Sequence, residues 1–134
     1  MDKYLQPYSA FERLRAEYKK HGSLIVAVDF DDTLYDFHKS GATYYRVIEL
    51  VRELKKIGCY IIIWTGNEDT SFIRRYCDKE GIYYDSINED APYIKNTARK
   101  VYANVYIDDR AGLSQVYSDL TRLVNEVKYK DETI

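Results

Sequence analysis

The chain has 134 residues, of which 46% are hydrophobic and 31% are charged. This length suits one domain with one hydrophobic core, and the composition is that of a globular protein and not of a disordered chain. The formal net charge of -2 excludes an overall basic field that gathers nucleic acid, although it allows a local basic patch. Residues 1–20 contain no uninterrupted apolar stretch, so we expect no signal peptide, no membrane span and a cytoplasmic location.

The two cysteines, Cys59 and Cys77, have no metal-type spacing; one opens an apolar run and the other lies in a helical pattern. We expect both to be free thiols packed as small hydrophobic residues. Fifteen tyrosines are many for this length. Paired aromatic residues can stack on bases, but we favour their assignment to half-buried edges of strands and helices.

The first half of the chain alternates between amphipathic and continuously apolar segments. A helix is predicted over 9–22, with a capping serine near its start and a glycine at its end. A short apolar run predicts a buried strand over 24–29. A helix over 41–58 and a second buried strand over 59–65 follow.

The second half repeats this alternation less clearly. A third helix is predicted over 67–81 and a short third strand over 82–87. Pro92 and a poor periodicity favour a loop over 88–100 that runs into one or two helical turns. The last strand, the last helix and a frayed tail are predicted over 104–108, 114–127 and 128–134.

Strands that alternate with amphipathic helices indicate βαβ units and a mostly parallel sheet with right-handed crossovers. We therefore predict an α/β fold, a single three-layer Rossmann-like domain over residues 1–134 with strand order 3-2-1-4 and helices on both faces. Residues 1–22 form an N-terminal helical extension in this prediction. No internal repeat, low-complexity segment or linker interrupts the sequence.

Polar residues follow three of the predicted strands. The first strand ends at Asp29 and the chain continues to Asp31, the second ends at Thr65, and the fourth ends at Asp108 and Asp109. The carboxyl ends of parallel strands share one edge of a sheet, and ligands bind at that edge. We therefore expect these side chains to meet at a common site.

Several carboxylates in one cleft require either raised pKa values or a cation among them. Oxygen ligands without a nearby histidine or thiolate favour Mg2+ over zinc or copper. Lys100, shortly before the fourth strand, would add a positive charge. The alternative is that some acids only cap helices or solvate a loop, which is the better interpretation of Asp32 alone.

The same residues carry a resemblance to a known family. The sequence VAVDFDDTL resembles the first signature of the haloacid dehalogenase superfamily of phosphotransferases, with Asp29, Asp31 and Thr33 as its Asp-x-Asp-x-Thr. IIIWTG resembles the second signature and VYIDDR resembles the fourth, in the right order along the chain. The third signature is only a lysine or an arginine before the last strand.

The resemblance implies a mechanism for these residues. Asp29 would attack phosphorus and form an aspartyl-phosphate. Asp31 would protonate the leaving oxygen and then take a proton from the hydrolytic water. Mg2+ would be held by Asp29, the backbone carbonyl of Asp31, and Asp108.

The resemblance also implies a phosphate-binding group. Thr65 and Lys100 would stabilise the charge on the phosphoryl oxygens, with Gly66 beside Thr65. Lys100 is the first choice for the basic residue, and Arg99 and Lys95 are the alternatives. Further candidates are Asp109, as a second metal ligand through water or a partner that orients Lys100, Thr33, as a brace for the loop, and Arg110.

A short chain implies an uncapped form of this family. Only a short segment separates the first signature from the next helix, so no cap domain is expected. An open site suits a bulky or polymeric phosphoester, or a lid supplied by a second subunit of a homo-oligomer. The basic residues available to a phosphate chain are Lys95, Arg99, Arg110, Arg74 and Arg75.

The small size and the IDDR ending are similar to the phosphatase half of bacteriophage-type polynucleotide kinase-phosphatases. That similarity implies a nucleotide or a nucleic-acid end as the substrate, and a small phosphorylated metabolite is the other substrate class. In either case the expected partner is a phosphorylated substrate and not a membrane.

Two other functions compete with a phosphatase. A signalling receiver domain also has a parallel sheet, a phosphorylated aspartate and an acidic pair that holds magnesium. Its phosphoacceptor follows a middle strand, whereas here the second strand has no aspartate and the final strand carries Asp108 and Asp109. The other alternative is a catalytically inactive phosphate-binding protein of the same fold.

Overall fold

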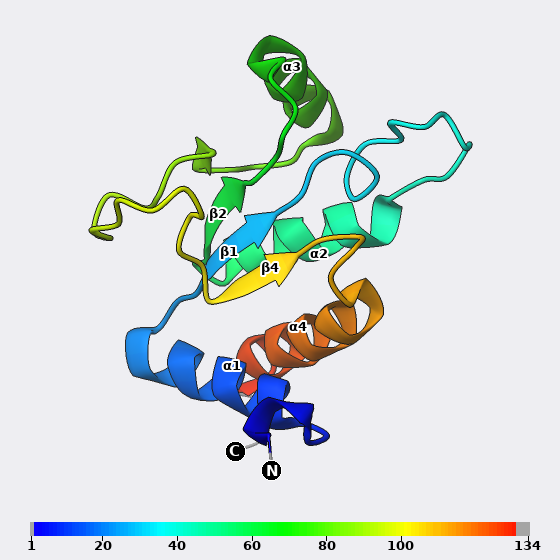
Figure 1. Ribbon diagram of the computed structural model, residues 1–134. Coiled ribbons are helices and arrows are strands. Elements are labelled where there is room, and N and C mark those ends of the chain that lie inside the picture. Colours follow the sequence, from blue (N-terminus) through cyan, green and yellow to red (C-terminus); the bar gives the residue numbers. More distant parts are fainter. Residues whose placement is uncertain (1, 131–134) are drawn as a thin grey trace.

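The computed structural model describes residues 2–130 (Figure 1). Its elements are η1 (Lys3–Leu5), α1 (Ser9–His21), β1 (Ile25–Val28), α2 (Tyr45–Lys56), β2 (Tyr60–Ile63), α3 (Thr70–Glu80), β3 (Ser86–Ile87), β4 (Val105–Ile107) and α4 (Leu113–Lys128). The predicted order of elements is confirmed, with shorter strands than the sequence indicated. Most of the predicted tail, residues 131–134, lies outside the described residues.

The sheet has the strand order β3-β2-β1-β4, and all of its strands are parallel. Val26 of the central strand pairs with Ile61 on one side and with Val105 on the other. Every residue of β1 is buried, as expected for a continuous apolar strand between two neighbours. The predicted α/β class and strand order are confirmed.

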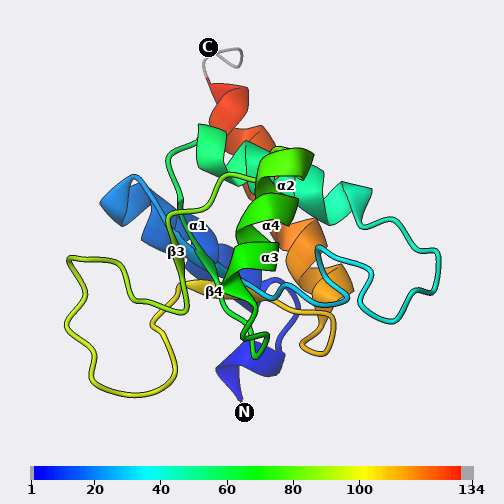
Figure 2. The ribbon, with the colours of Figure 1, turned by 90° about the horizontal axis from the view of Figure 1, so that it is seen from above.

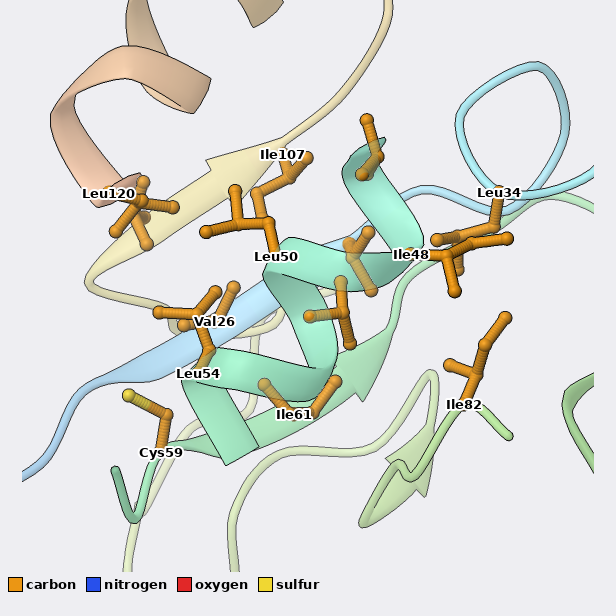
Figure 3. Close-up of a cluster of buried hydrophobic side chains, with 14 of the residues drawn as sticks. Val26, Leu34, Ile48, Leu50, Leu54, Cys59, Ile61, Ile82, Ile107 and Leu120 are labelled. Atoms are coloured by element: carbon orange, nitrogen blue, oxygen red, sulfur yellow. The ribbon is translucent and has the colours of Figure 1, made fainter. Parts of the chain in front are cut away.

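Side chains on alternate positions of the sheet belong to two separate apolar clusters. Val26 and Val28 pack with the buried residues of α1, α2, α3 and α4. Figure 3 shows part of this cluster around α2, including Leu50 and Leu54 above Ile61. Ile25 and Ala27 pack instead with apolar residues of the segment 88–104.

The structure corrects one detail of the predicted layers. All four described helices cover one face of the sheet, and the segment 88–104, which contains no helix, covers the other. Right-handed crossovers explain this division. The steps β1 to β2 and β2 to β3 run in one direction and place α2 and α3 on the same face, whereas the step from β3 to β4 runs back across the sheet.

The helical turns predicted within 88–100 are absent from the described structure. Pro92 cannot donate the backbone hydrogen bond of a helix interior. The carboxylate of Asp90 accepts hydrogen bonds from the backbone amide of Tyr102 and from the side chain of Asn96. Such side-chain bonds compete with helix formation and hold this segment in an irregular path.

The N-terminal residues are an integral part of the helical layer. Phe11 and Leu14 of α1 are buried in the main cluster. Arg15 of α1 donates two hydrogen bonds to the carboxylate of Glu126 on α4, at 3.0 and 2.8 Å. No helix within residues 2–130 has the length and apolarity needed to cross a membrane.

Both cysteines are buried free thiols, as predicted. Cys59 lies just before β2 at the base of the main cluster (Figure 3), and Cys77 lies on the buried side of α3. Burial raises the pKa of Cys59 to about 11 and that of Cys77 to about 12. Neither thiol is therefore placed for nucleophilic chemistry or metal binding.

Candidate functional site

Three aspartates meet at the carboxyl ends of the two central strands. Asp29 follows the last residue of β1, and Asp108 and Asp109 follow the last residue of β4. The backbone amide of Asp29 donates to the carbonyl of Ile107 at 2.8 Å, which extends the pairing of β1 with β4 into the site. One carboxylate oxygen of each aspartate lies within 4.8 Å of the other two. We call these three residues the acidic cluster.

A fully buried threonine joins two members of the acidic cluster. Oγ1 of Thr33 lies 3.1 Å from Oδ2 of Asp29 and 3.2 Å from Oδ1 of Asp109. The same oxygen accepts the backbone amide of Asp109 at 3.1 Å. Since a hydroxyl has one proton, it donates to one carboxylate at a time. Thr33 therefore braces the loop after β1 against the loop after β4.

The loop after β1 divides its side chains between the core and the site. Phe30 and Leu34 are buried in the main cluster, while the acidic residues between them, Asp31 and Asp32, are half-buried. The carbonyl of Phe30 accepts the backbone amides of Leu34 and Tyr35, at 2.9 and 3.0 Å. Asp32 has a positive φ of 59°, a conformation that aspartate tolerates better than most residues. The two buried apolar side chains and the hydrogen bonds to the Phe30 carbonyl thus anchor the loop.

Asp31 faces the loop that follows β2. Asn67 donates from Nδ2 to Oδ1 of Asp31 at 3.3 Å. The backbone amide of Asn67 donates to Oγ1 of Thr65 at 3.0 Å. Asn88, just after β3, accepts the amide of Thr65 at 2.8 Å and donates to its carbonyl at 2.9 Å. The residues after β1, β2 and β3 are therefore linked along one edge of the sheet.

Asn67 and Asn88 were not among the site residues expected from the sequence. Asn88 directly follows β3, which is the same signal that selected Asp29 and Asp108. Asn67 lies two residues after Thr65, within the loop of the second signature. A criterion that accepts any polar residue shortly after a strand, and not only a carboxylate, would have selected both asparagines.

The acidic cluster lacks an internal counter-charge. The pKa of Asp29 is raised to about 7, first by burial and then by the nearby carboxylates of Asp109 and Asp108. Hydrogen bonds from Thr33 and the Phe30 backbone act in the opposite direction. Within residues 2–130, no lysine or arginine forms an ion pair with these three carboxylates. The cluster is thus suited to bind either a proton or a cation.

The predicted phosphate-binding residues lie in two different parts of the structure. Thr65 is half-buried at the edge, and Gly66 beside it is exposed. Lys100 is exposed, and its ammonium lies 4.6 Å from the centre of the Tyr106 ring, on the face covered by 88–104. Its alternatives, Arg99 and Lys95, are exposed on the same segment. The structure therefore links Thr65 to Asp31 through Asn67, and it shows no contact between these basic residues and the acidic cluster within residues 2–130.

The exposed segment 36–44 forms one rim of the site. His38 contacts the carboxylate of Asp32 through Nδ1, and Lys39 donates to the hydroxyl of Tyr35 at 2.6 Å. Burial and the nearby carboxylates of Asp32, Asp36 and Asp109 raise the pKa of Tyr44. Arg110, also a predicted residue, is exposed beside the cluster and donates its backbone amide to Asp108 at 2.9 Å.

The edge is not covered by additional regular structure. Neither 36–44 nor 88–104 contains a helix or a strand in the described chain. Figure 2 shows these two segments projecting on opposite sides of the molecule. A groove of about 1360 Å3 lies elsewhere, between α1 and α4, and none of the predicted site residues lines it.

Comparison with known proteins supports the fold and no more. No family model matches the sequence, and no curated protein matches it. The structure is similar to that of a conserved protein from Bacteroides thetaiotaomicron, with a TM-score of 0.60 over 75% of this chain and 91% of that chain. The two sequences are 23% identical, so this similarity concerns the α/β Rossmann-like architecture alone.

Proposed function

We propose that the protein is a Mg2+-dependent phosphomonoester hydrolase that forms a transient aspartyl-phosphate on Asp29. The observation that carries this proposal is the acidic cluster at the carboxyl edge of a parallel sheet, with Asp31 and Thr65 on the adjoining loops. Ligands of open α/β sheets bind at this edge. The order of these residues along the chain also matches the haloacid dehalogenase signatures described above.

The chemistry of the cluster suits a hard divalent cation. Its donors are all carboxylate oxygens, and Mg2+ prefers oxygen ligands. The raised pKa of Asp29 indicates that its ionised form lacks a positive partner. In this proposal Asp29, Asp108 and the backbone carbonyl of Asp31 hold Mg2+, with Asp109 as an outer ligand. The ion would neutralise charge between the nucleophile and the anionic substrate.

The protein's own residues would carry out two successive displacements. A carboxylate oxygen of Asp29 attacks phosphorus, the ester P–O bond breaks, and Asp31 gives a proton to the leaving oxygen. Asp31 then takes a proton from the water that attacks the aspartyl-phosphate, which releases phosphate and restores Asp29. Asn67 holds Asp31 in place for both steps.

The phosphoryl oxygens need hydrogen-bond donors, and these hydrogen bonds become stronger as negative charge develops on the oxygens in the transition state. We assign this role to the hydroxyl of Thr65, which is half-buried, and to the backbone amide of Gly66, an exposed residue of the same loop after β2. A role for Lys100 stays a prediction from the sequence, since its ammonium contacts the Tyr106 ring in this structure.

An uncovered edge admits a nucleotide, a nucleic-acid end or a small phosphorylated metabolite, and we propose these as the substrate classes. A second copy of the chain that covers the edge in a homo-oligomer is compatible with this geometry. The two buried free thiols are compatible with action in the cytoplasm.

The test is steady-state hydrolysis of an aryl phosphate with Mg2+ or with EDTA. We expect Mg2+-dependent turnover that Asp29→Asn and Asp31→Asn abolish, while Asp78→Asn, at an exposed position of α3, leaves turnover unchanged. A stable stoichiometric phosphoprotein from an acyl phosphate, without turnover, would support a receiver-like function instead. No hydrolysis across a broad panel of phosphoesters would favour an inactive phosphate-binding protein.

A further inference from the structure

The loop formed by residues 90–102, here called the basic loop, is held in a fixed shape. Its base is closed by Asp90, whose Oδ1 accepts the backbone amide of Tyr102 at 2.7 Å. Asn96 spans its interior, donating from Nδ2 to the carboxylate of Asp90 and to the carbonyl of Lys100, at 2.8 Å for the latter. The loop is therefore preorganised and is not a flexible linker.

The basic loop displays a local positive charge in a chain of net charge -2. It contains Lys95, Arg99 and Lys100, all exposed, and its single acid is the Asp90 at its base. Asp90 accepts hydrogen bonds from neutral groups, and none of the three cations pairs with a carboxylate within residues 2–130. No carboxylate of the described residues therefore neutralises these charges, although the ammonium of Lys100 lies over the Tyr106 ring and would have to leave it to reach a phosphate.

A pocket of about 540 Å3 lies beside the basic loop. It is lined by Leu24 and Ile25, where β1 begins, and by Tyr93, Ile94 and Tyr102 of the basic loop. Tyr93 and Tyr102 come from the two limbs of the loop and are 65% and 45% exposed. Each tyrosine is two residues from a lysine, Lys95 or Lys100. Along the loop, the two tyrosines that line the pocket thus flank the three exposed cations.

We propose that the basic loop and this pocket bind single-stranded nucleic acid. Phosphates would contact Lys95, Arg99 and Lys100, and an unstacked base would lie against Tyr93 or Tyr102. Single strands are bound elsewhere by this combination of a cationic track and aromatic faces, because every base offers a π-face. An acidic peptide matches the cations but leaves the exposed tyrosines without a planar partner, so a single strand fits both features better.

This surface is distinct from the acidic cluster. The pocket is lined by Leu24 and Ile25, where β1 begins, whereas Asp29 follows the end of β1. The two sites therefore lie at opposite ends of the central strand. In Figure 2 the segment 88–104 lies on the opposite side of the molecule from the segment 36–44. The proposal therefore holds whether or not the protein is a phosphatase.

Fluorescence anisotropy with labelled single-stranded DNA and RNA that carry no terminal phosphate, in EDTA, tests the proposal without hydrolysis. We expect binding that weakens with salt, with log K against log salt falling with a slope of about -2, since about 0.7 counterions are released per phosphate and three cations are available. Replacing the three cations together, Lys95→Gln, Arg99→Gln and Lys100→Gln, should bring the slope near zero. The double variant Tyr93→Ala and Tyr102→Ala should weaken binding about fivefold or more, with the slope unchanged.

The matched control replaces three exposed lysines elsewhere, Lys19→Gln, Lys20→Gln and Lys79→Gln, and should bind like the wild type. Circular dichroism and thermal unfolding check that each variant folds. The proposal is overturned by an absence of binding at low salt, or by equal losses in the control and the basic-loop variant. It is also overturned if the tyrosine variant binds as tightly as the wild type, or if anionic lipid vesicles bind the loop while single strands do not.

Discussion

The hydroxyl oxygen of Thr33 lies 3.1 Å from Oδ2 of Asp29, although the threonine itself is fully buried. The same oxygen receives the backbone amide of Asp109. One side chain from the loop after β1 thus satisfies a donor after β4 and contacts the carboxylate that we propose as the nucleophile. The position of Asp29 consequently depends on a residue that does not reach the surface.

Thr33→Val should therefore lower both stability and activity. The valine has nearly the same shape but leaves the part-buried amide of Asp109 without its acceptor. A fully buried unpaired polar group costs about 1–3 kcal/mol, so we expect a loss near the lower end, about 1 kcal/mol. Urea unfolding measures the loss. Thr33→Ser keeps the hydroxyl and should recover most of the stability and the turnover. Equal losses in both variants would show that the methyl group, and not the hydroxyl, matters.

The acidic cluster should make stability depend on pH when no metal is present. The pKa of Asp29 is raised from 3.8 to about 7, so the folded state binds this proton more tightly than the unfolded state does. The resulting stabilisation is fully present below about pH 4 and is lost as the pH rises through about 7. In EDTA, the stability of Asp29→Asn relative to the wild type should therefore rise across this range.

Unfolding free energies of both proteins from acidic to mildly alkaline pH measure this difference. Asp78→Asn, which changes an exposed acid on α3, should differ from the wild type by the same amount at every pH. A difference between Asp29→Asn and the wild type that does not vary with pH would contradict the raised pKa.

Mg2+ should stabilise the wild type and not the Asp108→Asn variant. A ligand that binds only the folded state raises stability in proportion to the logarithm of its concentration above the Kd. In EDTA the variant should itself be the more stable protein, because it removes one of three mutually repelling carboxylates. Thermal unfolding with and without Mg2+ measures both effects. If Mg2+ raised the unfolding temperature of the two proteins equally, the ion would bind elsewhere.

The three longer strands of the sheet were predictable because they are short apolar runs, each followed closely by a polar residue, whereas β3 consists only of Ser86 and Ile87. The run that ends at Val28 leads directly to Asp29, and the run that ends at Ile107 leads to Asp108. The carboxyl ends of parallel strands share an edge, so the meeting of these two aspartates follows from the strand order alone. The same reasoning places Thr65 nearby.

The segment 88–104 was less predictable because its shape depends on contacts between residues distant in the sequence. Asp90 is held to Tyr102, and Asn104 accepts the amide of Ile25 through its side chain at 2.6 Å. No local periodicity encodes these bonds. These bonds set the position of Lys100. A motif that consists of a single lysine therefore says little about where that lysine lies, whereas each apolar run fixes the position of the aspartate that follows it.

Both thiols should resist alkylation in the folded protein. Burial raises the pKa of Cys59 to about 11 and that of Cys77 to about 12, so the reactive thiolate is scarce at neutral pH. Mass spectrometry after treatment with iodoacetamide should find both unmodified until denaturant is added. Rapid labelling of either cysteine under native conditions would show that its part of the core opens readily.

Asn67→Asp tests the contact that positions the proposed general acid. The change removes the Nδ2 donor to Asp31 but keeps Oδ1, which accepts the backbone amide of Asp69 at 2.9 Å. The loop after β2 should therefore stay folded, while a second carboxylate now repels Asp31. If Asp31 transfers the proton, kcat should fall about tenfold or more, a typical effect of disturbing general acid catalysis.

Steady-state kinetics and urea unfolding separate this effect from a loss of structure. Asn125→Asp, at an exposed position of α4, is the matched control for the added charge and should keep the wild-type kcat. Because Asn67 does not touch the acidic cluster in this structure, Mg2+ should still stabilise Asn67→Asp. A variant that loses both Mg2+ binding and turnover would indicate that Asn67 supports the whole edge of the sheet and not Asp31 alone.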